Sequence, residues 1–314
     1  MRERVLQTAH GTRSEAFGPT EWGLVSAVAL MWGSSFLWID VGLDAFRPPV
    51  VSLSRIALGA LALGLFRGSR RPVDRRDWPR VVLLAMAWSA IPLLLFPIAQ
   101  DLGVASSTAG MINGAVPLFA ATLAAILLRR MPRAIQIAGL LVGFLGVALV
   151  SVPAASGDEG SALGIALALV ASAFYALAAN LAVPLQQRYG ALPVIFRAQL
   201  VALVVVSPLG VAAIPGSRWA WGSALAMVVL GVFGTGVAYV ASSTLLGRVG
   251  PTRGPVPIYL IPVVALILGV AFRDERVAEV AFVGIGLILL GAYLTGRRER
   301  PRPGERARQG PPER

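Results

Sequence analysis

The chain has 314 residues, of which 56% are hydrophobic and only 14% are charged. Soluble domains are about 45–50% apolar and about 25% charged. A soluble protein this poor in charge could not cover its surface with polar groups, whereas a protein embedded in lipid has no such need. The composition therefore excludes a soluble protein and predicts an integral membrane protein.

The net charge is +12, and all 28 basic residues are arginine. Basic chains bind nucleic acid when their cations cluster on a soluble face, but here the arginines form short tracts between apolar runs. We therefore expect no nucleic-acid partner. The chain has no cysteine, and its one histidine, His10, lies in a polar stretch. We also expect no metal, no cofactor and no catalytic residue.

Apolar runs long enough to cross a bilayer as helices follow one another along the chain, since about 20 residues span the hydrocarbon core. The predicted spans are 22–39, 49–66, 80–99, 104–128, 133–152, 161–183, 193–213, 221–245, 254–272 and 277–295. We expect residues 1–20 to form a cytoplasmic tail without a signal peptide, and residues 296–314 to form a disordered Arg/Pro-rich cytoplasmic tail.

The arginines between these spans predict the orientation. If the N-terminus is cytoplasmic, 22 arginines lie on the inside and 4 on the outside. Positive residues are retained on the cytoplasmic side of membranes. The bias predicts a multi-pass protein of the plasma (inner) membrane with both termini in the cytoplasm, and hence an even number of spans.

A shift of 145 residues aligns the two halves of the chain. Pro117 then meets Pro262, and Gly146 meets Gly291. We expect two five-helix repeats, residues 21–152 and 161–295. Because five is odd, the second repeat enters the membrane from the opposite side, which is a recurring construction of secondary transporters. The predicted fold is all-α, with ten transmembrane helices in two inverted repeats.

Several segments resemble EamA-type transporters of the drug/metabolite transporter superfamily. They are LMWGSSF at 30–36, INGAVPLFAATLAAILL at 112–128, AGLLVGFLGVALV at 138–150 and the run from 258 to 294. Glu275 matches the family's acidic residue between the last two spans, whereas the first repeat has Arg130 there. The resemblance covers about 21–295 and implies transport of amino acids, metabolites or toxic compounds, commonly as export.

Two arginines fall inside predicted helices, where charge is costly and usually functional. Arg55 has Asp40, Asp44 and Asp101 as possible partners and is a candidate for an outer gate or for an anchor of a substrate carboxylate. Arg197 has no acidic residue at its level, which would leave it available for substrate or lipid phosphate. The alternative for both is that they reach to the lipid headgroups.

Prolines inside two helices point to a polar cavity near the middle of the membrane. Pro117 frees the carbonyl of Asn113, and Pro262 frees the carbonyl of Ile258, next to Tyr259. Such groups are tolerated only where they face protein or a wet cavity. The alternative is that these prolines only bend helices for packing.

Further polar or aromatic side chains inside the spans are candidates to line that cavity, although each could instead pack in the core. They are Trp32, Ser34, Ser35, Gln100, Tyr175, Asn180 and Tyr239. No Asp or Glu lies near the middle of the membrane, so a carboxylate proton relay is not expected.

These patterns favour a secondary transporter of the drug/metabolite type that exports a small metabolite, amino acid-like or amphipathic, by alternating access. The alternatives are an intramembrane enzyme and a membrane scaffold or sensor without transport. The expected partners are a small-molecule substrate and the lipid bilayer. A coupling ion and the choice between monomer and homodimer stay open.

Overall fold

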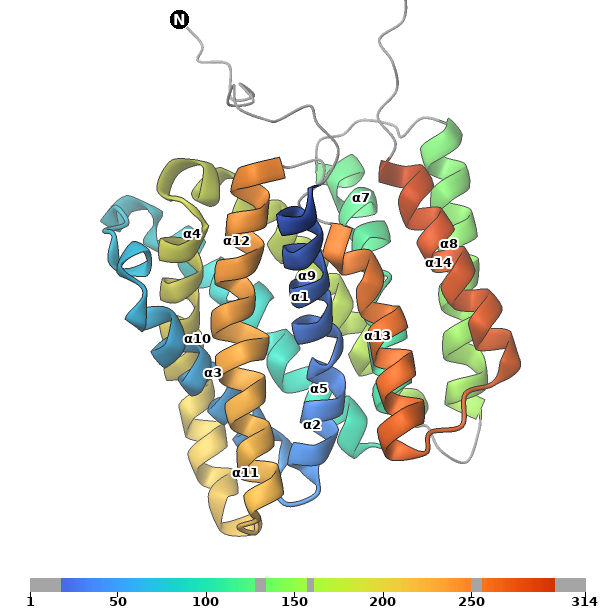
Figure 1. Cartoon of the computed structure of the whole chain (residues 1–314), viewed down its shortest axis with the longest axis horizontal. Coiled ribbons are helices and arrows are strands. Elements are labelled where there is room, and N and C mark those ends of the chain that lie inside the picture. Colours follow the sequence, from blue (N-terminus) through green and yellow to red (C-terminus); the bar gives the residue numbers. More distant parts are fainter. Residues whose placement is uncertain (1–17, 128–133, 157–160, 250–255, 297–314) are drawn as a thin grey trace, which may run out of the picture.

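A computed structural model describes residues 18–127, 134–156, 161–249 and 256–296, and every element in these ranges is helical (Figure 1). Most of both predicted tails, and Arg130, lie outside the described residues. The elements are α1 (Pro19–Gly33), α2 (Ser35–Leu43), α3 (Pro48–Leu65), η1 (Arg67–Arg70), η2 (Arg75–Asp77), α4 (Trp78–Ala85), η3 (Met86–Ala90), α5 (Ile91–Asp101), α6 (Ser106–Asn113), α7 (Val116–Leu127), α8 (Ala134–Ser156), α9 (Ala162–Tyr189), α10 (Ala191–Ala213), η4 (Ile214–Gly216), α11 (Trp221–Val228), η5 (Val229–Val237), α12 (Ala238–Val249), α13 (Val256–Arg273) and α14 (Glu279–Gly296).

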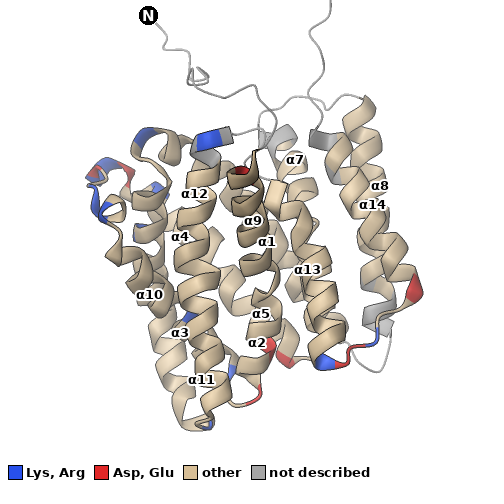
Figure 2. Ribbon diagram, viewed as in Figure 1, with Lys and Arg blue, Asp and Glu red and all other residues tan. Residues whose placement is uncertain are grey.

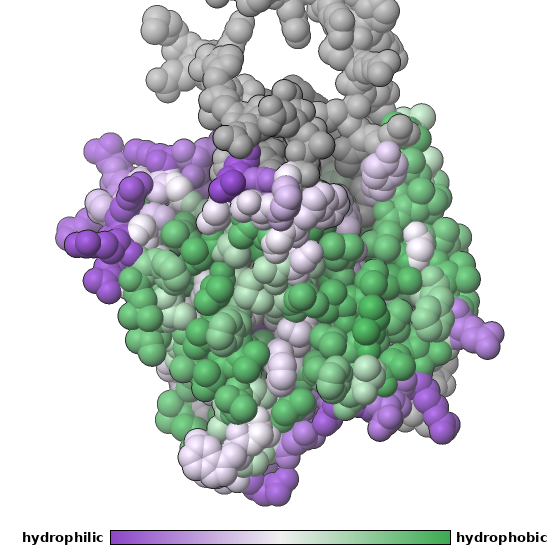
Figure 3. Space-filling model, in the orientation of Figure 1, coloured by the Kyte–Doolittle hydropathy of each residue, from purple (hydrophilic) through white to green (hydrophobic). Residues whose placement is uncertain are grey.

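Seven helical segments of the described chain are long and apolar enough to cross a membrane. They are Pro19–Leu43, Pro48–Leu65, Arg75–Asp101, Ala162–Tyr189, Ala191–Gly216, Trp221–Leu245 and Val256–Arg273. Two further apolar helices, Ala134–Val150 and Glu279–Gly291, are shorter, and the segment of α6 and α7 is interrupted. Figure 3 shows a hydrophobic band between two hydrophilic rims. The membrane character is confirmed, while ten crossings and their inversion stay predictions.

Four of the helical segments are interrupted near their middle. Ser34 separates α1 from α2, and Gly114 and Ala115 separate α6 from α7. The π-helix η3 precedes Pro92, and a second π-helix, η5, carries three glycines. A π-helical turn leaves the regular hydrogen-bond ladder and is frequent at functional sites. These four interruptions mark the places where the backbone leaves the regular α-helix.

Glycines allow two of the helices to touch through their backbones. A Cβ atom on Gly146 of α8 would overlap the carbonyl of Gly284 on α14, and one on Gly291 would overlap the carbonyl of Gly139. Small residues of this kind let membrane helices approach closely. Helices α8 and α14 accordingly lie side by side at one edge of the bundle (Figure 1).

The two ends of the bundle differ in charge. Helix α1 begins and α14 ends on the same side, and Figure 2 shows most of the described arginines at that end. The opposite end carries a mixture of acidic residues and arginines. We call the first the arginine-rich end and the second the mixed-charge end.

Candidate functional site

A cavity of about 160 Å³ lies inside the bundle, which is enough for several water molecules at about 10–15 Å³ each. Helical segments from both halves of the chain contribute its wall, and most of its lining surface is apolar. The lining residues are Trp32, Ser35, Phe36, Ile39, Arg55, Trp88, Phe96, Asn113, Val116, Tyr175, Ala179, Tyr239, Ile258 and Ile261.

Aromatic rings form much of the wall. The ring of Tyr239 lies edge-to-face against Trp32 at 5.8 Å and against Trp88 at 5.9 Å, and Trp88 Nε1 donates a hydrogen bond to the Tyr239 hydroxyl. Phe36 and Phe96 meet edge-to-face at 5.2 Å. These ring contacts keep the wall rigid and offer faces for an apolar group or a cation.

Arg55 is the one charged residue among the lining residues. Its Nε donates to Thr235 Oγ1 at 3.2 Å, and its Nη2 lies 3.5 Å from Ser35 Oγ. Within the described ranges no acidic side chain pairs with it, so none of the possible partners Asp40, Asp44 and Asp101 does so. The carboxylates of Asp40 and Asp44 lie nearer to a different arginine at the end of α13. The Arg55 charge therefore enters the cavity with only neutral hydrogen-bond partners.

Asn113 lies where α6 ends. Its side chain lines the cavity with 8% of the residue exposed, and its Oδ1 is buried without a hydrogen-bond partner. We expected Pro117 to sit inside a continuous helix, and this is wrong. The chain breaks at Gly114, which packs directly against Pro262 of α13, and Pro117 falls in the first turn of α7, where proline is tolerated.

Arg197 binds backbone carbonyls of two segments and is not among the residues that line the cavity. Its Nη1 donates to the carbonyl of Pro193 at 3.1 Å and to the carbonyl of Ser69 in η1 at 3.2 Å. The guanidinium thus finds backbone acceptors in place of the missing acid. It ties α10 to the turn after α3, outside the cavity lining.

Two predicted amides also hold helices together outside the lining. Asn180 Nδ2 donates to the carbonyl of Ala120 at 3.2 Å and joins α9 to α7. Gln100 Nε2 donates to the carbonyl of Phe36 at 3.1 Å and joins α5 to α2. The NH₂ group of each amide donates to a carbonyl of another helix, which sequence spacing does not reveal. The other predicted residues that do not line the cavity are Ser34, Pro117, Tyr259 and Pro262.

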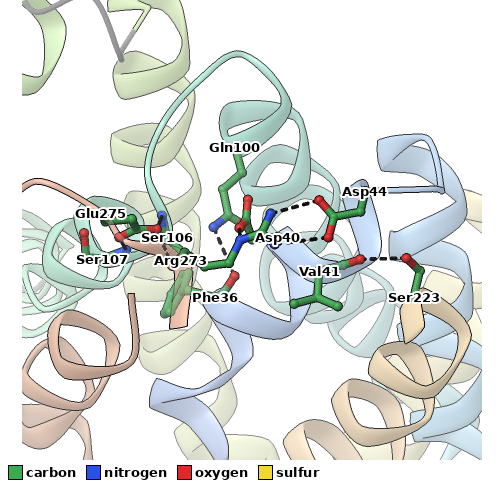
Figure 4. A network of polar contacts seen from close by, with 10 residues as sticks. All are labelled: Phe36, Asp40, Val41, Asp44, Gln100, Ser106, Ser107, Ser223, Arg273 and Glu275. Atoms are coloured by element: carbon green, nitrogen blue, oxygen red, sulfur yellow. Dashed lines mark hydrogen bonds and ion pairs between the residues drawn. The ribbon is translucent and has the colours of Figure 1, made fainter. Parts of the chain in front are cut away.

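An ion-pair cluster lies at the mixed-charge end (Figure 4). Arg273 at the end of α13 binds Asp44 through two contacts, of 3.1 Å and 2.9 Å, and also pairs with Asp40 of α2. Asp40 directly follows Ile39, which lines the cavity. The cluster therefore joins α13 to α2 directly beside the cavity wall.

Glu275 extends this network to α6 (Figure 4). Its carboxylate accepts hydrogen bonds from Ser106 N at 2.7 Å, Ser106 Oγ at 2.7 Å and Ser107 N at 2.9 Å. A negative charge at a helix N-terminus satisfies unpaired N–H groups and favours the helix dipole. Glu275 thus fixes the start of α6 and hence the position of Asn113 one helix length away.

Sequence reasoning missed several lining residues, above all Trp88 and the two phenylalanines of the wall. Trp88 lies in the middle of a predicted span, away from the membrane ends where tryptophan usually sits. That position was a usable signal. Phe36 and Phe96 carry no such signal, because phenylalanine is common in any apolar helix.

Comparisons with known proteins agree with this architecture. The EamA-like transporter family matches residues 22–152 and 162–297. A probable terminal-alkyne amino-acid exporter of Streptantibioticus cattleyicolor is 31% identical over 283 residues, covering 88% of this chain and 93% of that protein. A probable amino-acid metabolite efflux pump of Escherichia coli is 26% identical, covering 86% and 93%. The uncharacterized inner membrane transporter YedA of the same species is 24% identical, covering 87% and 89%. A crystal structure with 18% identity superposes with a TM-score of 0.58 over 88% of this chain and 96% of that one, and supports the fold alone.

Proposed function

Because the chain belongs to the EamA-like transporter family, we propose that it exports a small amino-acid-like metabolite with a free carboxylate across the plasma (inner) membrane. The substrate occupies the cavity, with Trp32, Ser35, Arg55, Asn113 and Tyr239 among its contacts. Transport proceeds by alternating access between the two sides. Two relatives named as amino-acid or amino-acid metabolite exporters support the substrate class.

The observation that carries the proposal is the isolated charge of Arg55. A cation held away from water is costly unless an anion compensates it. The partners of Arg55 are the hydroxyls of Thr235 and Ser35, which carry no charge. A guanidinium binds a carboxylate through two parallel hydrogen bonds. A substrate carboxylate supplies both the missing charge and the missing acceptors, while the aromatic wall accommodates an apolar side chain.

The proposal includes the topology inferred from the sequence. Ten helices in two inverted five-helix repeats, with both termini in the cytoplasm, place the arginine-rich end inside. The mixed-charge end then faces outward, and the pairs of Arg273 with Asp40 and Asp44 hold it closed in this conformation. Export requires these pairs to part when the outer end opens.

Counterflow in proteoliposomes tests the proposal. Unlabelled L-phenylalanine or L-leucine inside the vesicles should drive uptake of the labelled amino acid. Replacing Arg55→Gln should lower the initial rate by at least about 30-fold, because truncating one partner of a buried charge pair costs about 2 kcal/mol or more. Arg55→Lys should retain part of the activity, since it keeps the charge.

Arg197→Gln is the matched control, because Arg197 is a second intramembrane arginine that binds only backbone carbonyls outside the cavity. It should change the rate by less than about threefold once protein amount is matched. Absence of counterflow for every carboxylate offered would favour the alternatives, an intramembrane enzyme or a scaffold. Equal losses in Arg55→Gln and Arg55→Lys would show that Arg55 is needed for packing and not for charge.

A further inference from the structure

The helix break beside Asn113 gathers backbone carbonyls that lack their usual donors. In a regular helix the carbonyl of Asn113 would bind the N–H of residue 117, and that of Ile258 the N–H of residue 262. Both positions are proline, which has no N–H. Asn113 and Ile258 both line the cavity. Pro262 packs against Gly114, so these two carbonyl-bearing turns lie together.

The side chain of Asn113 adds a third acceptor. Its Oδ1 is buried without a partner, although buried polar atoms are normally hydrogen-bonded. Asn113 is also the last residue of α6, whose C-terminal end carries the negative pole of the helix dipole. An unpaired amide oxygen, loose carbonyls and a helix C-terminus all favour a positive charge at this place.

The residues around this place decide whether it suits a monovalent or a divalent cation. No carboxylate of the described residues lines the cavity, so their contribution to the site is limited to partial negative charges. Neutral oxygens and aromatic faces suit a monovalent cation such as an ammonium group, and half-helix ends with unwound carbonyls bind such charges in transporters. A divalent ion needs carboxylate ligands.

We propose that the α6–α7 break is a subsite for one monovalent cationic centre, supplied by the ammonium group of the substrate or by a coupling sodium ion. This inference rests on the proposed function, because it assumes that Arg55 holds the carboxylate. Where the substrate supplies the cation, the cavity distinguishes an amino acid from the same acid without its amino group. Asn113 is a specificity-determining residue in this arrangement.

Binding to the purified full-length protein in nanodiscs, measured by calorimetry, tests the subsite. The probes are L-phenylalanine and 3-phenylpropanoate, which lacks the amino group, with L-leucine and 4-methylpentanoate as a second pair. Each is titrated in sodium and in potassium buffer. If the substrate supplies the cation, the amino acid should bind at least about 10-fold tighter than its partner in both buffers. If sodium supplies it, the acid without an amino group should bind about 10-fold tighter in sodium than in potassium.

Two variants of Asn113 test whether the preference for an amino group or for sodium arises at this subsite. Asn113→Leu should abolish the amino or sodium preference, whereas Asn113→Asp should increase the preference because it adds a full negative charge. The Asp variant keeps the size of the side chain, so the test does not depend on the Leu variant folding. Gln199→Leu is the control, since Gln199 is a fully buried amide without partners that does not line the cavity. It should keep the wild-type preference.

Two results would overturn the inference in distinguishable ways. If wild-type protein binds 3-phenylpropanoate as tightly as L-phenylalanine, binds each equally in sodium and in potassium, and Arg55→Gln weakens both, the subsite is absent while the proposed function stands. If no carboxylate binds, or Arg55→Gln changes nothing, the proposed function fails and the subsite fails with it. A preference that Asn113→Asp and Asn113→Leu leave unchanged also refutes the assignment to Asn113.

Discussion

Replacing Arg273 should favour opening of the bundle at its mixed-charge end. The guanidinium is 30% exposed and binds Asp44, which is 52% exposed, through two contacts, together with Asp40, which is 24% exposed. Exposed ion pairs contribute about 0.2–1 kcal/mol each, and paired contacts on one carboxylate fall in the upper part of that range. If the mixed-charge end faces outward as proposed, losing both pairs in Arg273→Gln should shift the balance toward opening of that end by about 1–2 kcal/mol, or about 5–30-fold in population.

The absence of cysteine makes this shift measurable with a single introduced thiol. Ser35→Cys places a probe of nearly the same size in the cavity wall. A membrane-impermeant methanethiosulfonate reagent, applied from outside to intact cells, should react about 5–30-fold faster when Arg273→Gln is added, because the rate follows the open population.

Arg248→Gln is the control, since Arg248 forms a similar ion pair with Glu21 at the opposite end of the bundle. It should not accelerate labelling from outside. An unchanged rate in Arg273→Gln, with the same labelling once the protein is unfolded, would refute the reasoning that these pairs hold the outer end closed. Acceleration by both variants would point to general loosening of the bundle.

Two stability predictions concern the elements that position Asn113, and thermal unfolding in detergent measures both. Gly114→Ala should lower the stability by about 1–3 kcal/mol, because a Cβ there would overlap Pro262. Gly286→Ala is the control and should be neutral or stabilising, because a Cβ there meets nothing within 4 Å. An unchanged unfolding midpoint for Gly114→Ala would show that the helix break has room for the added methyl group. Glu275→Gln should cost about 1–2 kcal/mol, because it replaces a charged acceptor of three hydrogen bonds at the start of α6. Glu279→Gln, in the first turn of α14, should change the midpoint less, and equal effects of the two would contradict a capping role for Glu275.

Most of the fold could be predicted from the sequence because lipid restricts which backbone structures can cross a membrane. Lipid requires every backbone group to be satisfied within its own helix, so long apolar runs can be assigned as helices from hydropathy alone. Helix covers most of each predicted range in the described chain. The differences are local: the helix is interrupted at Ser34 and at Gly114–Ala115, and it contains the π-helices η3 and η5. A proline pattern shows that a helix is weakened but does not show whether it bends or stops, because that depends on what packs against it.

The site was anticipated only in part, and the reason differs from residue to residue. Arg55 was identifiable because a charge inside an apolar run is rare and costly. Asn180 and Arg197 looked equally suitable, yet both donate to carbonyls of neighbouring segments. Spacing along one helix does not say which carbonyl of another helix lies within 3 Å, so polar residues that join helices and those that line a cavity look alike in a sequence.

By itself, the sequence determined the membrane class, the helical content, the family resemblance and the presence of intramembrane arginines, because these depend on composition and on periodicity within single segments. Only the tertiary structure decided which side chains form ion pairs and hydrogen bonds with one another. It pairs Asp40 and Asp44 with Arg273 and leaves Arg55 to neutral hydroxyls, and it brings Glu275 to the start of α6. Apart from the contact of Arg55 with Ser35, those pairings join segments more than 160 residues apart in the sequence, and the packing of helices that brings them together is a property of the whole bundle.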